Sequence, residues 1–337
     1  MRKFLLILFL LVILLGAGFA YFVLVMPNIQ SDKRVSLKIP TGSNYQQVLQ
    51  LLRQNKILKS EFSFGLVSQL KKYPQQVKSG YYTFDPSMNN RQIVNILRAG
   101  LQTPVKLVIY NIRTKEEFAG LVGRTLELDS NTLLTTLNDT AFCNRLGVDT
   151  NQVLSRFVVD NYEFYWNIPQ DKFLEKMKVA FQTFWTPERR AKAKVLNLTT
   201  AGVTTLASIV EREVIRDKEL VTVAGVYLNR LKIGMPLQAD PTLVFALRDF
   251  NARRVTAYHK EYDSPYNTYM YVGLPPGPIC MPRKKSIDAV LNYENHGYLY
   301  FCANPDMSGY SIFSETYDDQ IKVAAQYRRK LNEMNIH

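Results

Sequence analysis

The chain has 337 residues, of which 47% are apolar, 12% aromatic and 21% charged. This composition excludes a disordered chain, because it supplies enough apolar side chains for two or three globular units. The net charge of +13 favours anionic surroundings such as nucleic acid, phospholipid head groups or an acidic polymer, without choosing among them.

Cysteine and histidine are scarce, which bears on metals and cofactors. The three cysteines, Cys143, Cys280 and Cys302, fit neither a disulfide framework nor a zinc site, and one Cys280–Cys302 bridge stays open as an alternative. The histidines, which include the terminal His337, lie far apart, and the sequence has no HExxH, P-loop or GxGxxG motif. We therefore expect no metal and no cofactor.

The first predicted element is an apolar run over residues 4–26 that contains no charged side chain. Its length is about what an α-helix needs to cross roughly 30 Å of hydrocarbon. Arg2 and Lys3 precede the run, which favours a cytoplasmic N-terminus and an extracytoplasmic body. The alternative is a signal peptide cleaved near residues 18–20, but the apolar run extends beyond the usual length of such a peptide.

This run predicts a single-pass protein of the inner (cytoplasmic) membrane whose body lies in the periplasm or its extracytoplasmic equivalent. The basic clusters of the chain are scattered and carry no nucleic-acid-binding motif, so we expect no nucleic-acid partner.

Residues 34–101 are predicted to form a small α+β unit, and residues 1–33 supply the anchor and a short linker. VSLKIP at 35–40 and GYYTF at 80–84 are predicted strands. Ser43 and Gln46 resemble a capping box that opens one helix, a second helix covers 59–70, and a third covers 90–97 before Gly100. The alternative is a plain spacer between the membrane and the rest of the chain.

Residues 102–337 are predicted to form a larger α+β domain. A strand at 104–110 precedes helices at 115–125, 130–137, 172–185 and 187–196, and the chain ends with strands at 298–303 and 311–313 and a helix at 317–332. The aromatic segment DNYEFYWNIP at 160–169 would suit stacking on sugar rings, and an ordinary core or domain seam explains it equally well.

The segment ASIVERE at 207–213 carries two acids on a predicted helix with Thr199 or Thr200 as its N-cap. Glu211 and Glu213 lie on opposite shoulders of its apolar stripe, so periodicity alone does not choose between them. A carboxyl at the edge of an apolar face is partly desolvated, which raises its pKa and suits it to proton transfer near neutral pH. The alternative is that both acids are solvated flank residues.

Three loops rich in proline, glycine and polar residues follow, at 237–242, 264–269 and 273–279. Hydrogen-bonding groups beside aromatic rings suit hydroxyl-rich and acetamido-bearing sugars. Each of these groups would equally well satisfy loop backbone, above all the aspartate before Pro241. The candidate substrate-binding residues are Gln238, Asp240, Tyr266, Asn267, Thr268 and Tyr269.

The segments ASIVERE, VAGVYLNRLKIGMPLQADPT, SPYNTYMYVGLPPGPI and YLYFCAN resemble, in order and spacing, the MltG (YceG-like) family of endolytic murein transglycosylases. The resemblance spans about residues 35–335. It implies a membrane anchor, a LysM-like βααβ subdomain at 34–101 and a YceG-like catalytic domain at 102–337. By the same resemblance, Glu211 takes the place of the catalytic glutamate.

The reaction that the resemblance implies is cleavage of the β-1,4 bond between N-acetylmuramic acid and N-acetylglucosamine in nascent glycan strands. Glu211 would protonate the leaving oxygen and then accept the proton of the C6 hydroxyl as that oxygen closes on C1. The product is a 1,6-anhydro end, which terminates strand elongation. The expected partners are peptidoglycan glycan strands and the membrane, with peptidoglycan synthases as candidates.

The sequence departs from the family pattern at Ser311 and Gln320, where histidines are common, and in the segment VDNYEFYWNI at 159–168. These departures bear on substrate contacts rather than on Glu211. Two alternatives stay open: a non-catalytic scaffold that binds peptidoglycan or a synthase, and a hydrolase that uses two carboxylates.

Overall fold

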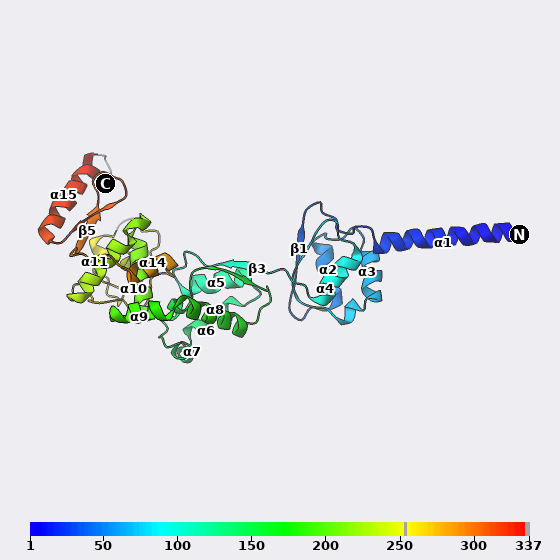
Figure 1. Cartoon of the computed structure of the whole chain (residues 1–337), viewed down its shortest axis with the longest axis horizontal. Coiled ribbons are helices and arrows are strands. Elements are labelled where there is room, and N and C mark those ends of the chain that lie inside the picture. The colour runs from blue at the N-terminus through cyan, green and yellow to red at the C-terminus, as the bar shows by residue number, and fades with distance from the viewer. Residues whose placement is uncertain (253–254, 334–337) are drawn as a thin grey trace. The chain divides into compact units, whose positions relative to one another are not determined.

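The computed structural model describes residues 1–252 and 255–333, so that His337 lies outside the described residues (Figure 1). The chain divides into two compact units. Unit 1 comprises residues 1–107, 122–128 and 162–169, and unit 2 comprises residues 108–121, 129–161 and 170–337. The mixture of helices with small sheets confirms the predicted α+β class.

Helix α1 (Arg2–Leu24) is the apolar run of the sequence. Its most apolar window of 18 residues has a mean hydropathy of 2.8 and is almost entirely exposed, as a helix that crosses a membrane would be. The aliphatic and aromatic side chains that cover it would be unfavourable in water, and this supports a single-pass membrane anchor.

The rest of unit 1 surrounds an antiparallel pair of strands, β1 (Val35–Ile39) and β2 (Gly80–Phe84), in which Leu37 lies opposite Tyr82. Helices α2 (Tyr45–Gln54), α3 (Glu61–Leu70) and α4 (Asn90–Ala99) and a 3₁₀ turn at Tyr73–Gln75 complete it, and β3 (Val105–Val108) pairs with β4 (Asn161–Phe164). The predicted strands and helices are confirmed. The capping box lies one residue further along than expected, because Asn44 rather than Ser43 caps α2 and pairs with Gln47.

A buried hydrogen-bonded network joins the end of α1 to this unit. The Asn90 amide donates to the Val23 carbonyl at 2.9 Å and to the Ser63 hydroxyl at 3.0 Å. The Asn28 amide donates to Asn90 Oδ1 at 2.6 Å and to the Ser60 carbonyl at 2.9 Å. These polar groups are excluded from water, so each depends on its protein partners.

Replacing Asn90 with alanine is expected to lower the free energy of unfolding of unit 1 by about 1–3 kcal/mol, because the Asn28 amide and the Val23 carbonyl lose their partner. Unit 1 contains Trp166 and unit 2 contains Trp185, so urea unfolding followed by tryptophan fluorescence in a Trp185→Phe background reports on unit 1. The exposed Gln50→Ala is the control and should change stability by less than about 0.5 kcal/mol. Equal effects of the two substitutions would contradict the role of the network.

Unit 2 is mainly helical, and helix α10 (Thr200–Glu213) runs through its core. Val203, Leu206 and Val210 of α10 pack in one buried cluster with Trp185 and Tyr227. Helix α5 (Lys115–Thr125) contributes residues to both units. The other elements of unit 2 are α6 (Ser130–Asn138), α7 (Thr140–Arg145), η2 (Val153–Arg156), α8 (Gln170–Phe184), α9 (Pro187–Val195), η3 (Asp217–Glu219), α11 (Leu220–Lys232), α12 (Asp240–Ala246), α13 (Ala257–Lys260), α14 (Lys284–Leu291), β5 (Tyr300–Ala303), β6 (Ser311–Ser314) and α15 (Tyr317–Glu333).

Several expectations need correction. Residues 240–246 form helix α12 instead of continuing a loop, because Pro241 fits the first turn of a helix. Helix α14, which the sequence did not reveal, follows Pro282.

All three cysteines are free, so the Cys280–Cys302 bridge is absent. In the aromatic segment, Tyr162, Phe164 and Trp166 are buried, which favours the explanation that they form core.

Candidate active site

Helix α10 brings two acids to its last turn. The Thr199 hydroxyl accepts the Gly202 amide at 3.0 Å and starts the helix, and the extended backbone of Val214 ends it. Residues 203–210 are all buried, and α11, α12 and α14 pack against the helix. Glu211 and Glu213 are therefore held on a rigid support while their side chains leave the core in different directions.

Glu211 is engaged by the start of helix α14. Its Oε2 accepts the Arg283 backbone amide at 2.7 Å and the Ser286 hydroxyl at 2.7 Å, and its Oε1 lies 3.0 Å from Arg283 Nε. Only 14% of the Glu211 side chain is exposed. A carboxylate in this position caps the amino end of α14 and neutralises Arg283, which is a structural role.

Glu213 lines a cavity of about 680 Å³, and Glu211 does not. The cavity is bounded by α12 and by parts of the chain that are distant in sequence. Its lining residues are Arg113, Arg212, Glu213, Asp240, Pro241, Val244, Phe245, Phe250, Ala252, Val255, Ile279 and Tyr327. Its volume lies within the range of roughly 300–1,000 Å³ that is usual for sites that bind small molecules.

Burial raises the pKa of Glu213 to about 7, and the nearby charge of Asp240 adds to this effect. A hydrogen bond from Tyr227, the charge of Arg230 and the Asp240 backbone amide act in the opposite direction without cancelling it. A carboxyl with a pKa near 7 exists in both protonation states at neutral pH. It can therefore donate a proton and take one back.

Two guanidinium groups line the same cavity. Arg113 lies over the Phe250 ring at 4.6 Å, and its pKa is lowered by burial and by the charge of Arg212. Arg212 donates from Nη2 to Asn111 at 2.8 Å, while its Nε is buried and has no hydrogen-bond partner within the described part of the chain. These groups give the cavity a cationic wall that is suited to acidic or oxygen-rich ligands.

Of the predicted sugar-binding residues, Asp240 and Tyr269 lie closest to this chemistry. The Tyr269 hydroxyl donates to Asp240 Oδ1 at 2.5 Å, and the Lys260 ammonium lies 4.6 Å from the centre of the Tyr269 ring. Burial and the Asp240 hydrogen bond raise the pKa of Tyr269. Asp240 is exposed and lines the cavity, so it is available to a ligand.

Asn267 and Thr268, which the sequence predicts to hold sugar, lie inside the loop. Both are buried, at 0% and 2% exposure. The Asn267 amide donates to the backbone carbonyls of Lys260 and Tyr262 at 2.9 and 2.8 Å. The Thr268 hydroxyl accepts the Ala239 amide at 3.0 Å. These hydrogen bonds hold the two loop segments that carry Tyr269 and Asp240.

Gln238 and Tyr266 are the remaining two predicted sugar-binding residues. Gln238 is exposed on a left-handed backbone with φ of 53°, and its amide donates to the Thr268 carbonyl at 2.9 Å. Tyr266 packs on Phe245 with ring centres 4.8 Å apart and lines a neighbouring cavity of about 230 Å³. Arg113 and Phe245 line both cavities, so the two spaces adjoin.

A carboxyl of raised pKa on the wall of a partly cationic cavity, on a helix-rich α+β framework, is an arrangement suited to enzymes that act by general acid/base catalysis. Comparison with known proteins supplies the family. The profile of the YceG-like family matches residues 37–326, so the chain belongs to the YceG-like family, as its motifs predict.

Two relatives carry the name endolytic murein transglycosylase. The protein of Bacillus subtilis (strain 168) is 26% identical over an alignment that covers 95% of this chain and 93% of the relative. That of Streptococcus pneumoniae serotype 2 (strain D39) is 27% identical over 90% of this chain, which spans only 60% of its length. A solved structure of a yceG-like protein from Listeria monocytogenes superposes with a TM-score of 0.59 at 28% identity, over 87% of this chain and 99% of that one.

Proposed function

We propose that this chain is an endolytic lytic transglycosylase of peptidoglycan in which Glu213, rather than Glu211, is the acid/base. The observation that carries the proposal is the position of Glu213 on the wall of the 680 Å³ cavity with a pKa of about 7. The names of the relatives support murein as the substrate. Glu211 is committed to Arg283 and Ser286 and would have to leave three hydrogen bonds before it met a sugar.

In the proposed reaction, Glu213 protonates the oxygen of the β-1,4 bond between N-acetylmuramic acid and N-acetylglucosamine. The resulting carboxylate then accepts the proton of the C6 hydroxyl as that oxygen bonds to C1, and a 1,6-anhydro end forms. One carboxyl completes both steps, and no water is consumed. Arg113 and Arg212 would donate hydrogen bonds to the oxygen-rich substituents of the muramic acid residue, while Asp240 and Tyr269 would hold hydroxyl groups.

A hydrolase is the second candidate, because Asp240 lies close enough to Glu213 to raise its pKa. A pair of carboxylates can activate water or form a covalent intermediate. The Tyr269 hydroxyl donates a hydrogen bond to one carboxylate oxygen of Asp240, so that oxygen is already in use. This favours the transglycosylase over the hydrolase.

Helix α1 would hold the enzyme in the inner (cytoplasmic) membrane with its N-terminus in the cytoplasm, because Arg2 and Lys3 precede the apolar run. The body would then meet nascent glycan strands outside the membrane, where peptidoglycan synthases are candidate partners. We retain residues 34–101 as a LysM-like subdomain and 102–337 as the catalytic domain within this proposal. The order β1, α2, α3, β2 agrees with a βααβ subdomain.

The products of the purified full-length protein acting on glycan strands test the proposal. We expect saccharides with 1,6-anhydro ends, which mass spectrometry separates from reducing ends by the mass of one water. Reducing ends would identify the hydrolase instead. Absence of any cleavage by the folded wild-type protein would leave the non-catalytic scaffold as the better explanation.

A further inference from the structure

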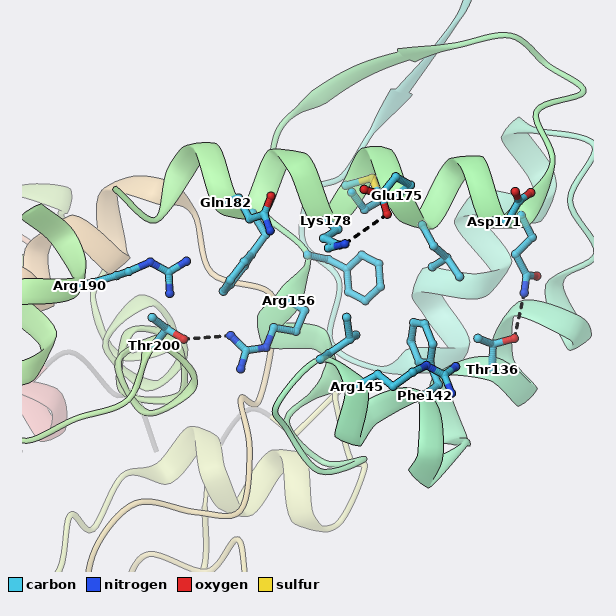
Figure 2. A pocket seen from close by; sticks show the side chains of 16 residues that line it. Thr136, Phe142, Arg145, Arg156, Asp171, Glu175, Lys178, Gln182, Arg190 and Thr200 are labelled. Atoms are coloured by element: carbon cyan, nitrogen blue, oxygen red, sulfur yellow. Dashed lines mark hydrogen bonds and ion pairs between the residues drawn. The ribbon is translucent and has the colours of Figure 1, made fainter. Parts of the chain in front are cut away.

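A second cavity in unit 2 has no role in the reaction described above. It has a volume of about 660 Å³ and lies among α6, α7, η2, α8 and the first residue of α10 (Figure 2). It shares no lining residue with the cavity of Glu213. Its floor is apolar and is formed by Phe142, Leu146, Phe157, Leu174, Met177 and Phe181.

One end of this cavity is cationic. Arg156 donates from Nη1 to the Thr200 hydroxyl at 2.9 Å and from Nη2 to the Gly147 carbonyl at 3.0 Å. Its Nε is buried and, within the described part of the chain, has no hydrogen-bond partner. Arg190 lies on the same side, and both guanidinium groups contact the Phe181 ring, at 4.8 and 5.7 Å from its centre (Figure 2).

The two arginines lack a counter-charge. Arg190 donates from Nε to the Trp185 carbonyl at 2.9 Å, and across the described residues no carboxylate forms an ion pair with Arg156 or Arg190. Burial and the charge of Arg190 lower the pKa of Arg156. Arg156 is half-buried and Arg190 is exposed, so an anion can reach both guanidinium groups, and the site is suited to a carboxylate or a phosphate.

The opposite end and the walls are polar. Asp171 lies at the end away from Arg190 and Thr200, and beside it the Gln170 amide donates to the Thr136 hydroxyl at 2.9 Å (Figure 2). The Gln182 side chain lies between the two ends, on α8. Arg145 and the Lys178–Glu175 ion pair, at 3.4 Å, also line the cavity. The cavity thus offers two arginines at one end, Asp171 at the other, amide groups and an apolar floor.

We propose that this cavity binds a short acidic peptide of the kind that murein glycan strands carry. A peptide carboxylate would contact Arg156 and Arg190, its ammonium group would face Asp171, and Gln182 would meet its backbone amides. Small aliphatic side chains would cover the apolar floor. An isoprenyl phosphate would suit the cavity less well, because its hydrocarbon would desolvate Asp171 and Gln182 without forming hydrogen bonds to them.

This inference rests on the proposed function, since it takes the peptide from the same polymer, but it concerns a separate site. Isothermal titration calorimetry of the full chain in detergent, with the free tetrapeptide L-Ala-γ-D-Glu-diaminopimelate-D-Ala, tests it. We expect saturable binding to the wild-type protein. Arg156→Gln and Arg190→Gln should each weaken binding roughly 10- to 100-fold, because a charge-assisted hydrogen bond is lost. The peptide with its carboxylates amidated should bind as weakly to the wild-type protein.

Arg329→Gln on α15 removes the same charge from an exposed position and is the matched control, for which affinity should not change. Arg190→Gln guards against a folding defect in Arg156→Gln, since Arg156 also holds the Gly147 carbonyl. Failure of the wild-type protein to bind the peptide, equal affinity in all variants, or binding of farnesyl phosphate in place of the peptide would overturn the proposal. The same preparations are assayed for anhydro ends, so a failure of peptide binding is distinguished from a failure of the proposed function.

Discussion

A Glu213→Gln protein is expected to release anhydro-ended saccharides roughly 10²- to 10⁴-fold more slowly than the wild-type protein, because the amide can neither donate nor accept the transferred proton. The substitution preserves the shape of the side chain and removes a group that burial already makes costly to ionise. The fold should therefore stay intact. The measurement is the rate of product release from purified glycan strands, followed by liquid chromatography and mass spectrometry.

Glu211→Gln is the matched control, since it makes the same chemical change two residues away on the same helix. Its amide keeps one acceptor oxygen but loses the charge that faces Arg283, so we expect a loss of about 1–3 kcal/mol in the stability of unit 2. Below the melting temperature, its rate should fall less than tenfold. A folded Glu211→Gln protein without activity, together with an active Glu213→Gln protein, would show that Glu211 is the acid/base.

The sequence placed both acids on one helix; periodicity did not choose between them, and the family resemblance assigned the catalytic role to Glu211, whereas our proposal gives it to Glu213. The N-cap at Thr199 and the apolar spacing are local signals, and the structure agrees with them. The choice depends on α14, which lies some 70 residues further along and whose first turn binds Glu211. Because the contact is a tertiary one, neither periodicity nor the quoted motif reveals it.

The predicted sugar-binding loops illustrate the same limit. Composition identified polar side chains between 238 and 269, but it could not tell which of them turn inward. Asn267 bonds to carbonyls five and seven residues earlier, and Thr268 bonds across to Ala239. These contacts leave Asp240 on the wall of the cavity, with the Tyr269 hydroxyl hydrogen-bonded to it. The strands and helices of unit 1 were easier to predict, because alternation and capping residues are local in sequence.

The pH dependence of the reaction is expected to move when Asp240 is replaced by asparagine. Glu213 must be protonated to start the reaction, so kcat/KM should fall as the pH rises through its pKa of about 7. The negative charge of Asp240 raises that pKa, and removing the charge lowers it. The alkaline limb of the profile, where kcat/KM falls, should therefore shift to lower pH. We expect a shift of only about half a pH unit to one pH unit, because solvent screens the charge of the exposed Asp240.

The asparagine oxygen can still accept the Tyr269 hydroxyl, so the shift separates the charge of Asp240 from its hydrogen bond. Asp249→Asn, an exposed change in the same unit, should leave the limb in place. The profile is measured as kcat/KM for glycan strands between about pH 5 and pH 9, at constant ionic strength because salt screens surface charges. The prediction fails if the pH at which kcat/KM falls does not change in Asp240→Asn, or if it changes equally in Asp249→Asn. Either result would mean that the group titrating near pH 7 is not Glu213 beside Asp240.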